Sequence, residues 1–146
     1  MSTNPGPFRF HGGLHLEDHK SESLTGEIVA SSLPAQLVLR VSQHIGEPNT
    51  PLVKVGDRVS RYQPLATSNE AVSTPVHSPV DGRVVAIEPR PVAHPSGRDD
   101  LCIVIEPDGH QVNAEPDGHG GDPDDLLDRI RQAGIVGLGG AVFPTA

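Results

Sequence analysis

Eight histidines are the first side chains to consider for chemistry, because imidazole binds metals and titrates near neutral pH. His11, His15 and His19 are spaced by four residues, which on a helix would place all three on one face. Gly12 and Gly13 separate the first two, and the segment has no helical periodicity. A solvated or locally packed set therefore explains these histidines better than a metal site does.

His44 and His77 lie at the ends of expected strands. We predict that both form structural hydrogen bonds rather than act as catalytic bases. No serine or cysteine has the context of a nucleophile, and no pair of carboxylates has a spacing that supports acid–base chemistry. The sequence thus predicts no catalytic residue and no metal ligand.

The one cysteine, Cys102, lies in an apolar run and is interpreted as a small buried core residue. A single cysteine excludes a disulfide framework, and this indicates a reducing compartment. It also cannot by itself hold a structural zinc ion or an iron–sulfur cluster. The string Glu-Pro-Asp-Gly-His occurs at 106–110 and 115–119, but Pro-Asp-Gly is a turn signature and is read as such.

A glycine-rich segment near the end of the chain is the one pattern that suggests ligand binding. Gly137, Gly139 and Gly140, followed by Ala141, would let backbone N–H groups approach a phosphate or a flavin ring without interference from Cβ atoms. The pattern is weak by itself. It does not match the dinucleotide fingerprint, because a helix rather than a strand precedes it.

Short strands and turns must position these residues. Gly (16) and Pro (15) exceed a fifth of the 146 residues, against roughly an eighth on average, and there is no Trp. Val84, Ala86 and Glu88 should share one face of their strand, with Val85 and Ile87 on the other. This pattern predicts a mainly β fold, a small closed barrel or sandwich, with strands at 36–41, 52–55, 63–67, 74–78, 83–88 and 101–106.

The chain divides into five segments: an extended N-terminal arm (1–34), the β domain (35–107), an acidic Gly/Pro loop (108–121), a helix (122–134) and a glycine-rich end (135–146). Asp122 should cap the helix, with Pro123 in its first turn and Gly134 as its stop. Leu126, Leu127 and Ile130 should form an apolar stripe along this helix. The uncharged, abrupt end predicts a fragment of a longer protein.

The net charge of −8 argues against a nucleic-acid partner. No run of 18 apolar residues predicts a membrane span, and Met1–Phe10 has no apolar signal-peptide region.

Three segments together resemble a known fold. Residues 53–59, 63–66 and 75–84 are similar to the biotinyl/lipoyl-type barrel-sandwich hybrid. In that family a lysine carries the cofactor, and its position here is at or near Ala71. The only lysines are Lys20 and Lys54, so we do not expect a swinging-arm carrier.

The order of motifs along nearly the whole chain is more specific. It resembles the N-terminal part of RnfC, a subunit of the Rnf ion-translocating electron transport complex. The motifs are Phe10-His11-Gly12-Gly13, Ser42-Gln43-His44-Ile45-Gly46, Pro75-Val76-His77-Ser78, His94-Pro95-Ser96-Gly97 and Ala133-Gly134-Ile135-Val136-Gly137-Leu138-Gly139-Gly140-Ala141.

The resemblance implies a peripheral subunit on the cytoplasmic face of a bacterial inner membrane, with other Rnf subunits and the remainder of its own chain as partners. The family exchanges electrons with NADH through FMN and two 4Fe–4S clusters. Residues 135–146 would begin the flavin/NADH domain, with Gly137, Gly139, Gly140 and Ala141 as part of its FMN/NADH loop. Val142 departs from the glycine usual there, and a Val adopts positive φ at a cost.

We therefore expect a structural, non-catalytic domain that binds no cofactor by itself. A stand-alone lipoyl-like adaptor without the carrier lysine is the alternative, and a reading frame that stops at Ala146 would favour it. A metal-binding protein that uses the N-terminal and loop histidines is a third reading, which zinc or nickel titration would test.

Overall fold

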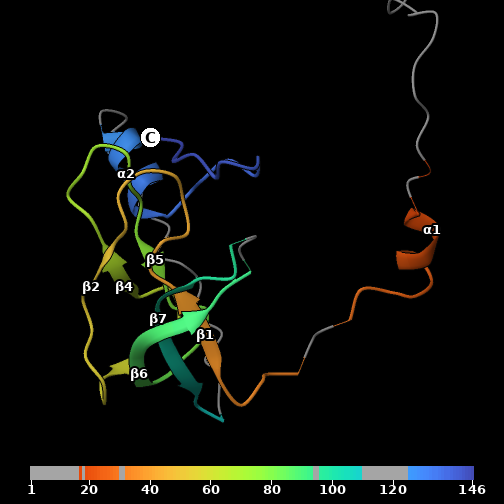
Figure 1. The fold of residues 1–146 in the computed structure, drawn as a ribbon, viewed down its shortest axis with the longest axis horizontal. Coiled ribbons are helices and arrows are strands. Elements are labelled where there is room, and N and C mark those ends of the chain that lie inside the picture. Colours follow the sequence, from red (N-terminus) through yellow and green to blue (C-terminus); the bar gives the residue numbers. More distant parts are fainter. Residues whose placement is uncertain (1–16, 18, 30–31, 94–95, 110–124) are drawn as a thin grey trace, which may run out of the picture. The chain divides into compact units, whose positions relative to one another are not determined.

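The computed structural model describes residues 17, 19–29, 32–93, 96–109 and 125–146. The chain separates into two units, Met1–Ser32 and Leu33–Ala146. In the described residues the second unit contains seven strands and helix α2 (Leu126–Gln132), drawn in Figure 1. The strands are β1 (Leu37–Arg40), β2 (Thr50–Pro51), β3 (Arg58–Val59), β4 (Pro64–Thr67), β5 (Val76–His77), β6 (Gly82–Pro91) and β7 (Asp99–Pro107).

The strands form two antiparallel sheets. One has four strands in the order β1-β7-β6-β3, and the other has three in the order β2-β4-β5. The two longest strands, β6 and β7, pair over most of their length, from Gly82 opposite Pro107 to Pro91 opposite Asp99. The prediction of a mainly β fold is therefore confirmed.

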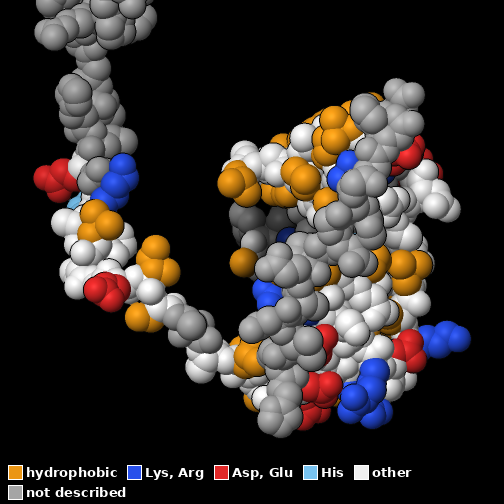
Figure 2. Space-filling model, turned by 180° about the vertical axis from the view of Figure 1, so that it is seen from behind, with side chains coloured by type: hydrophobic (Ala, Val, Ile, Leu, Met, Phe, Trp, Pro, Cys, Tyr) orange, Lys and Arg blue, Asp and Glu red, His pale blue; other side chains and the backbone are white. Residues whose placement is uncertain are grey.

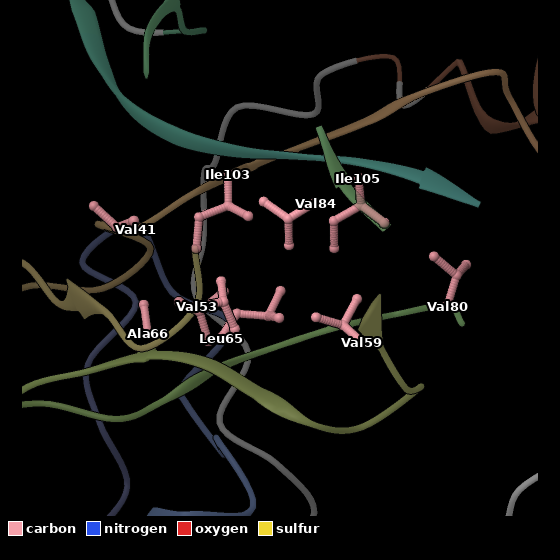
Figure 3. Close-up of a cluster of buried hydrophobic side chains, with 10 residues drawn as sticks. Val41, Val53, Val59, Leu65, Ala66, Val80, Val84, Ile103 and Ile105 are labelled. Carbon is pink, nitrogen blue, oxygen red and sulfur yellow. The ribbon is translucent and has the colours of Figure 1, made fainter. Parts of the chain in front are cut away.

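The core lies between the two sheets and consists mostly of valine, leucine and isoleucine. Figure 3 shows Ile103 and Ile105 of β7 facing Leu65 of β4, and all three side chains are fully buried. The remaining members of the cluster are Val41, Val53, Val59, Ala66, Val76, Val80 and Val84. Aliphatic side chains of this size fill a thin space between short strands, which explains how a chain without Trp forms a core.

One strand lies earlier than predicted. We expected a strand at 52–55, but β2 is Thr50–Pro51, and Val53 enters the core from an irregular segment. A tight turn follows, in which the Lys54 backbone N–H donates to the Asp57 carboxylate and the Asp57 N–H donates to the Lys54 carbonyl. Backbone groups of Lys54 and Asp57 are therefore bonded within the turn and not to a neighbouring strand.

The predicted alternation along β6 is wrong. The register shifts between Val84 and Ala86, where an irregularity interrupts the pairing with β7. Val84 is in the core, and Ile87, three residues later, packs against the same core rather than facing the other way. A β-bulge adds a residue to one strand and changes which face the following side chains occupy.

We predicted that the N-terminal unit is extended, but its described residues include a short helix. His19 has a left-handed φ of 49°, and a one-turn helix α1 (Lys20–Ser23) follows it. The side chains of Leu24, Ile28 and Val29 are exposed. His11 and His15 lie outside the described residues, and exposed His19 interacts with Glu17 and Glu22.

Within the described residues, helix α2 covers Leu126–Gln132 of the predicted 122–134. Asp122 and Pro123, the expected N-cap and first-turn residues, lie outside the described residues, and Asp125 is the N-cap with no side-chain capping bond. Of the predicted apolar stripe, Leu126 and Leu127 are exposed and Ile130 is partly buried, and no residue of α2 is fully buried. The helix has only seven residues, and its C-terminal end is hydrogen-bonded to the β domain.

Candidate functional site: the C-terminal hairpin and its contacts with the barrel

The glycine-rich end of the chain folds back on itself as a small hairpin, residues 135–145, which we call the C-terminal hairpin. The Gly137 N–H donates to the Phe143 carbonyl at 2.8 Å, and the Thr145 N–H donates to the Ile135 carbonyl at 3.1 Å. Val136 and Pro144 form a bridge between the two arms. The segment is thus held by its own backbone hydrogen bonds.

Gly134 ends helix α2 and starts the hairpin, as predicted. Its φ is +72°, its N–H donates to the Arg131 carbonyl, and the Ile135 N–H reaches the Ile130 carbonyl. These two bonds form a Schellman motif, which needs a left-handed residue at this position. A Cβ atom on Gly134 would also lie 3.0 Å from Nδ1 of His77, so the residue must be small for the helix end to approach β5.

Three barrel residues form hydrogen bonds with the helix end and the hairpin. Thr74 donates its hydroxyl to the Arg131 carbonyl at 2.8 Å, and the His77 ring bonds to the backbone of Gln132. The Ile45 N–H donates to the Ala141 carbonyl at 3.2 Å. All three bonds use the backbone of the C-terminal segment, so they fix its path whatever its side chains are.

A buried network holds Thr74 in place. The Thr74 N–H donates to Nε2 of His44 at 3.2 Å, and the Asn49 side-chain amide donates to the Thr74 carbonyl at 2.9 Å. Nδ1 of His44 lies 2.9 Å from the Ile45 carbonyl, and Nε2 lies 3.1 Å from the Thr74 carbonyl, so both ring nitrogens contact the backbone. The predicted structural hydrogen bonds of His44 and His77 are confirmed, but only His77 lies at a strand end, because His44 is in the segment between β1 and β2.

Burial lowers the pKa of His77, since water stabilises the charged imidazolium better than the half-buried contact with α2 does. The hydrogen bond to Gln132 opposes this effect but is the smaller of the two. Neutral His77 is therefore the form that suits the contact between β5 and the helix end.

The structure places the four predicted cofactor-binding residues at and beside the tip of the hairpin. Gly139 and Gly140 are exposed, and a Cβ atom on either would meet nothing within 4 Å. Gly137 uses its N–H within the hairpin, and Ala141 uses its carbonyl to accept from Ile45. The tip therefore offers an open backbone surface, but nothing in the described residues faces it from the other side.

Val142 stands at the turn of the hairpin with a left-handed φ of 47°. Its N–H donates to the Gly139 carbonyl at 3.0 Å, which closes the turn. A β-branched residue in this region is strained by about 1–3 kcal/mol. The conformation is thus the one that glycine would favour, although valine occupies the position.

FMN does not fit the hairpin as a complete site. A phosphate group needs donors, and the N–H groups of Gly137 and Val142 already have carbonyl partners within the loop. Residues 133–146 include no charged side chain that could pair with the phosphate. The exposed tip can supply one wall of a binding site, not the whole site.

The connection between β4 and β5 carries no lysine. Residues 69–71 are exposed, and the resemblance to carrier domains predicted the modified lysine at or near Ala71. Ser73 folds the connection back by donating to the Glu70 carbonyl at 2.6 Å, and Val72 lies against Gly46. Lys20 is in α1 and Lys54 is in the turn before β3.

Cys102 is fully buried in β7, as predicted, and burial raises the pKa of its thiol. A buried, protonated thiol is a poor nucleophile and a poor metal ligand. With one cysteine, this chain does not fit a 4Fe–4S cluster, which requires several thiolates. No cluster of three metal-binding side chains occurs in the described residues, and His110 and His119 lie outside them.

Sequence reasoning did not identify Thr74 or Asn49. Both are buried polar residues that connect segments far apart in the sequence. The only local signal was their position just before short strands, which is common to many residues with no such role.

Two facing antiparallel sheets, with a connection without lysine between β4 and β5 of the smaller sheet, define a barrel-sandwich hybrid that lacks the carrier side chain. Residues 8–110 match the family of RnfC barrel sandwich hybrid domains. The chain belongs to this family, and the predicted fold class is confirmed.

Several relatives are named as subunits of an ion-translocating oxidoreductase complex. One from Vibrio cholerae is 48% identical over 141 residues, one from Yersinia pestis is 43% identical and one from Serratia proteamaculans is 41% identical. Each alignment covers 94% of this chain but only 18%, 23% and 20% of the relative. The chain thus spans about a fifth of the length of these relatives. No helix in the described part of the chain is long and apolar enough to cross a membrane.

Proposed function

We propose that this chain is the N-terminal, non-catalytic domain of an RnfC-type subunit in a membrane-associated complex that couples NADH and ferredoxin redox chemistry to ion translocation. The 48% identity to the Vibrio cholerae relative carries the proposal. The barrel without a carrier lysine supports it, since such a barrel has no group to transfer and serves as a scaffold. Other subunits of the complex, at the cytoplasmic face of a bacterial inner membrane, are its partners.

The role of the barrel in this proposal is to orient the C-terminal hairpin. Thr74, His77 and Ile45 hold the backbone of residues 131–141, so the exposed tip keeps a fixed direction relative to the sheets. In a protein of family length, Gly137, Gly139, Gly140 and Ala141 would form one wall of the FMN and NADH site. Residues outside this chain would supply the other wall and the two 4Fe–4S clusters.

The chain alone is then expected to bind neither FMN nor NADH. Titration of the 146-residue chain with each, followed by flavin fluorescence and by calorimetry, should show no saturable binding. Saturable binding of either molecule would contradict the proposal, because one wall of a site would have been sufficient.

A chimera tests the membership of the complex. In the Vibrio cholerae relative, the matched region is replaced by this chain, and the product is expressed in a strain that lacks its own copy of that relative. We expect NADH-dependent electron transfer in membranes to be restored. No restoration by a chimera that is present in the membranes at the normal level would argue against the assignment.

A further inference from the structure

Strand β1 is the outer strand of the four-stranded sheet, where it pairs with β7 on one side (Figure 1). The Val41 N–H donates to the Leu101 carbonyl, and in an antiparallel ladder every second residue bonds to the same neighbour. The backbone of Leu39 therefore faces β7, whereas the backbone of Val38 and Arg40 faces away from it. These outward groups form the free side of the sheet, which we call the β1 edge.

The β1 edge carries unpaired backbone groups around an apolar side chain. The Val38 N–H and C=O and the Arg40 N–H have no hydrogen-bond partner among the residues that the structure describes. The Arg40 carbonyl accepts from the Gln43 side-chain amide at 3.0 Å, and the Arg40 guanidinium is ion-paired with Asp100 at 2.7 Å. The side chain of Val38 is 50% exposed. The edge therefore offers two donors and one acceptor, with its nearest charge neutralised within the sheet.

The outer edges of β6 and β2 carry proline instead. Leu101 bonds to β1 and lies opposite Pro89, so the backbone of Pro89 faces away from β7, as does that of Pro91 two residues later. In the other sheet the Leu52 N–H donates toward β4, so Pro51, the residue before it, faces away from β4. Proline has no N–H for an incoming strand, and natural sheets use it to prevent pairing at their edges.

The short strand β3 carries a charge at its edge. It has two residues, and the side chain of Arg58 is 73% exposed, against 32% for Arg40. Figure 2 shows Lys, Arg, Asp and Glu side chains gathered at the lower end of the larger unit, where Figure 1 labels β6. Exposed charge also discourages strand pairing. Among β1, β2, β3 and β6, the β1 edge thus lacks both proline and a mostly exposed charge.

We propose that the β1 edge binds an extended, uncharged segment of another polypeptide by strand addition. In this mode main-chain hydrogen bonds give affinity and alternate side chains give specificity. The chain after β1 runs through residues 42–49 to β2 of the other sheet and does not fill the edge. A four-residue strand suits a short peptide, whereas a stable contact between two copies needs roughly 1,000 Å² of buried surface. The inference goes beyond the proposed function and does not depend on it.

A synthetic peptide, acetyl-Thr-Val-Thr-Val-Thr-amide, is the probe, because it is uncharged and favours an extended backbone. It is titrated into the ¹⁵N-labelled 146-residue chain, and the amide chemical shifts are followed. We expect saturable shifts at the Val38 and Arg40 amides, and none at Ile87, whose N–H lies on the proline-containing edge of β6. In the free chain, the Val38 amide should exchange with solvent quickly.

A substitution at the centre of the edge separates backbone pairing from side-chain contact. Val38→Pro removes the outward N–H without removing a bond to β7, so the fold should be kept while the affinity for the peptide falls by about tenfold or more. Val38→Ala is the matched control. It keeps the N–H, and its affinity should stay within about threefold of the unmodified chain.

No saturable shift at Val38, or equal shifts at Val38 and Ile87, would overturn the proposal. A slowly exchanging Val38 amide in the free monomer would do the same, because the edge would already be filled by the chain itself. A dimer that becomes monomeric with Val38→Pro would assign the edge to a second copy and contradict the proposal. The titration of the unmodified chain decides the question even where Val38→Pro does not fold.

Discussion

The barrel and the C-terminal hairpin differ in the interactions that hold them and in where they place their apolar side chains. The barrel buries its aliphatic side chains between two sheets, where Leu65, Ile103 and Ile105 are fully inaccessible. The hairpin is held through backbone hydrogen bonds and leaves Leu138 and Phe143 outside. The difference shows that the barrel is stabilised by its own contacts, whereas the hairpin has an ordered backbone and an uncovered apolar face.

The largest effect should come from the core. Leu65→Ala removes a side chain packed between the sheets and should lower the free energy of unfolding by about 3 kcal/mol. Leu138→Ala, the same change on the hairpin, should alter it by less than about 0.5 kcal/mol. Urea denaturation of both variants measures the contrast, and similar losses would remove the distinction between the two regions.

The strained turn gives the next effect. Val142→Gly releases the cost of a left-handed valine and should raise the free energy of unfolding, or of local opening, by about 1 kcal/mol. Val136→Gly, in the other arm of the hairpin and without positive φ, is the control and should lower it by about the same amount. Hydrogen exchange at the Gly137 amide reports both changes. A loss of protection in Val142→Gly would show that the turn is not strained.

Removing one hydrogen bond between the barrel and helix α2 should have a smaller effect. Thr74→Val keeps the shape but removes the hydroxyl that donates to the Arg131 carbonyl, at a cost of roughly 0.5–1 kcal/mol. Amides of α2 and the hairpin should then exchange faster, while those of β7 stay unchanged. Uniform acceleration in β7 as well would mean that the hairpin and the core open together.

The smallest expected effect is the pH dependence of the contact between His77 and helix α2. Burial lowers the pKa of His77 from its ordinary value of 6.5, so the unfolded state binds more protons than the folded state below this value. The stability due to neutral His77 is fully present above pH 6.5 and decreases as the pH falls through the lowered pKa. Exchange of the α2 amides should therefore quicken, after correction for intrinsic rates, between about pH 7 and pH 5. His77→Gln should flatten this dependence.

The sequence predicted the elements that local patterns determine. Short runs of leucine and β-branched residues identified β1 and most of β7, and Pro64 marked the start of β4, where a missing N–H costs least. Gly134 was identified as the helix stop, because few other residues tolerate a left-handed φ. Burial of Cys102 followed from the apolar run around it.

Local patterns could not predict what depends on pairing across the chain. The bulge in β6 arises from its register with β7, and β2 is defined by its pairing with β4. The role of Thr74 depends on His44, thirty residues earlier, and on Arg131, fifty-seven residues later. The hairpin site was suggested by its glycines, but its direction and its uncovered face required the structure.

Hydrogen exchange at the Gly137 and Val142 amides, compared between the 146-residue chain and the Vibrio cholerae chimera, tests the central claim most directly. Both amides are hydrogen-bonded in the hairpin but lie beside its exposed face. The account predicts modest protection in the short chain, well below that of β7, and protection close to that of β7 in the chimera. Equal protection of the two amides in both proteins would contradict the claim that the barrel presents the hairpin to the rest of a longer protein.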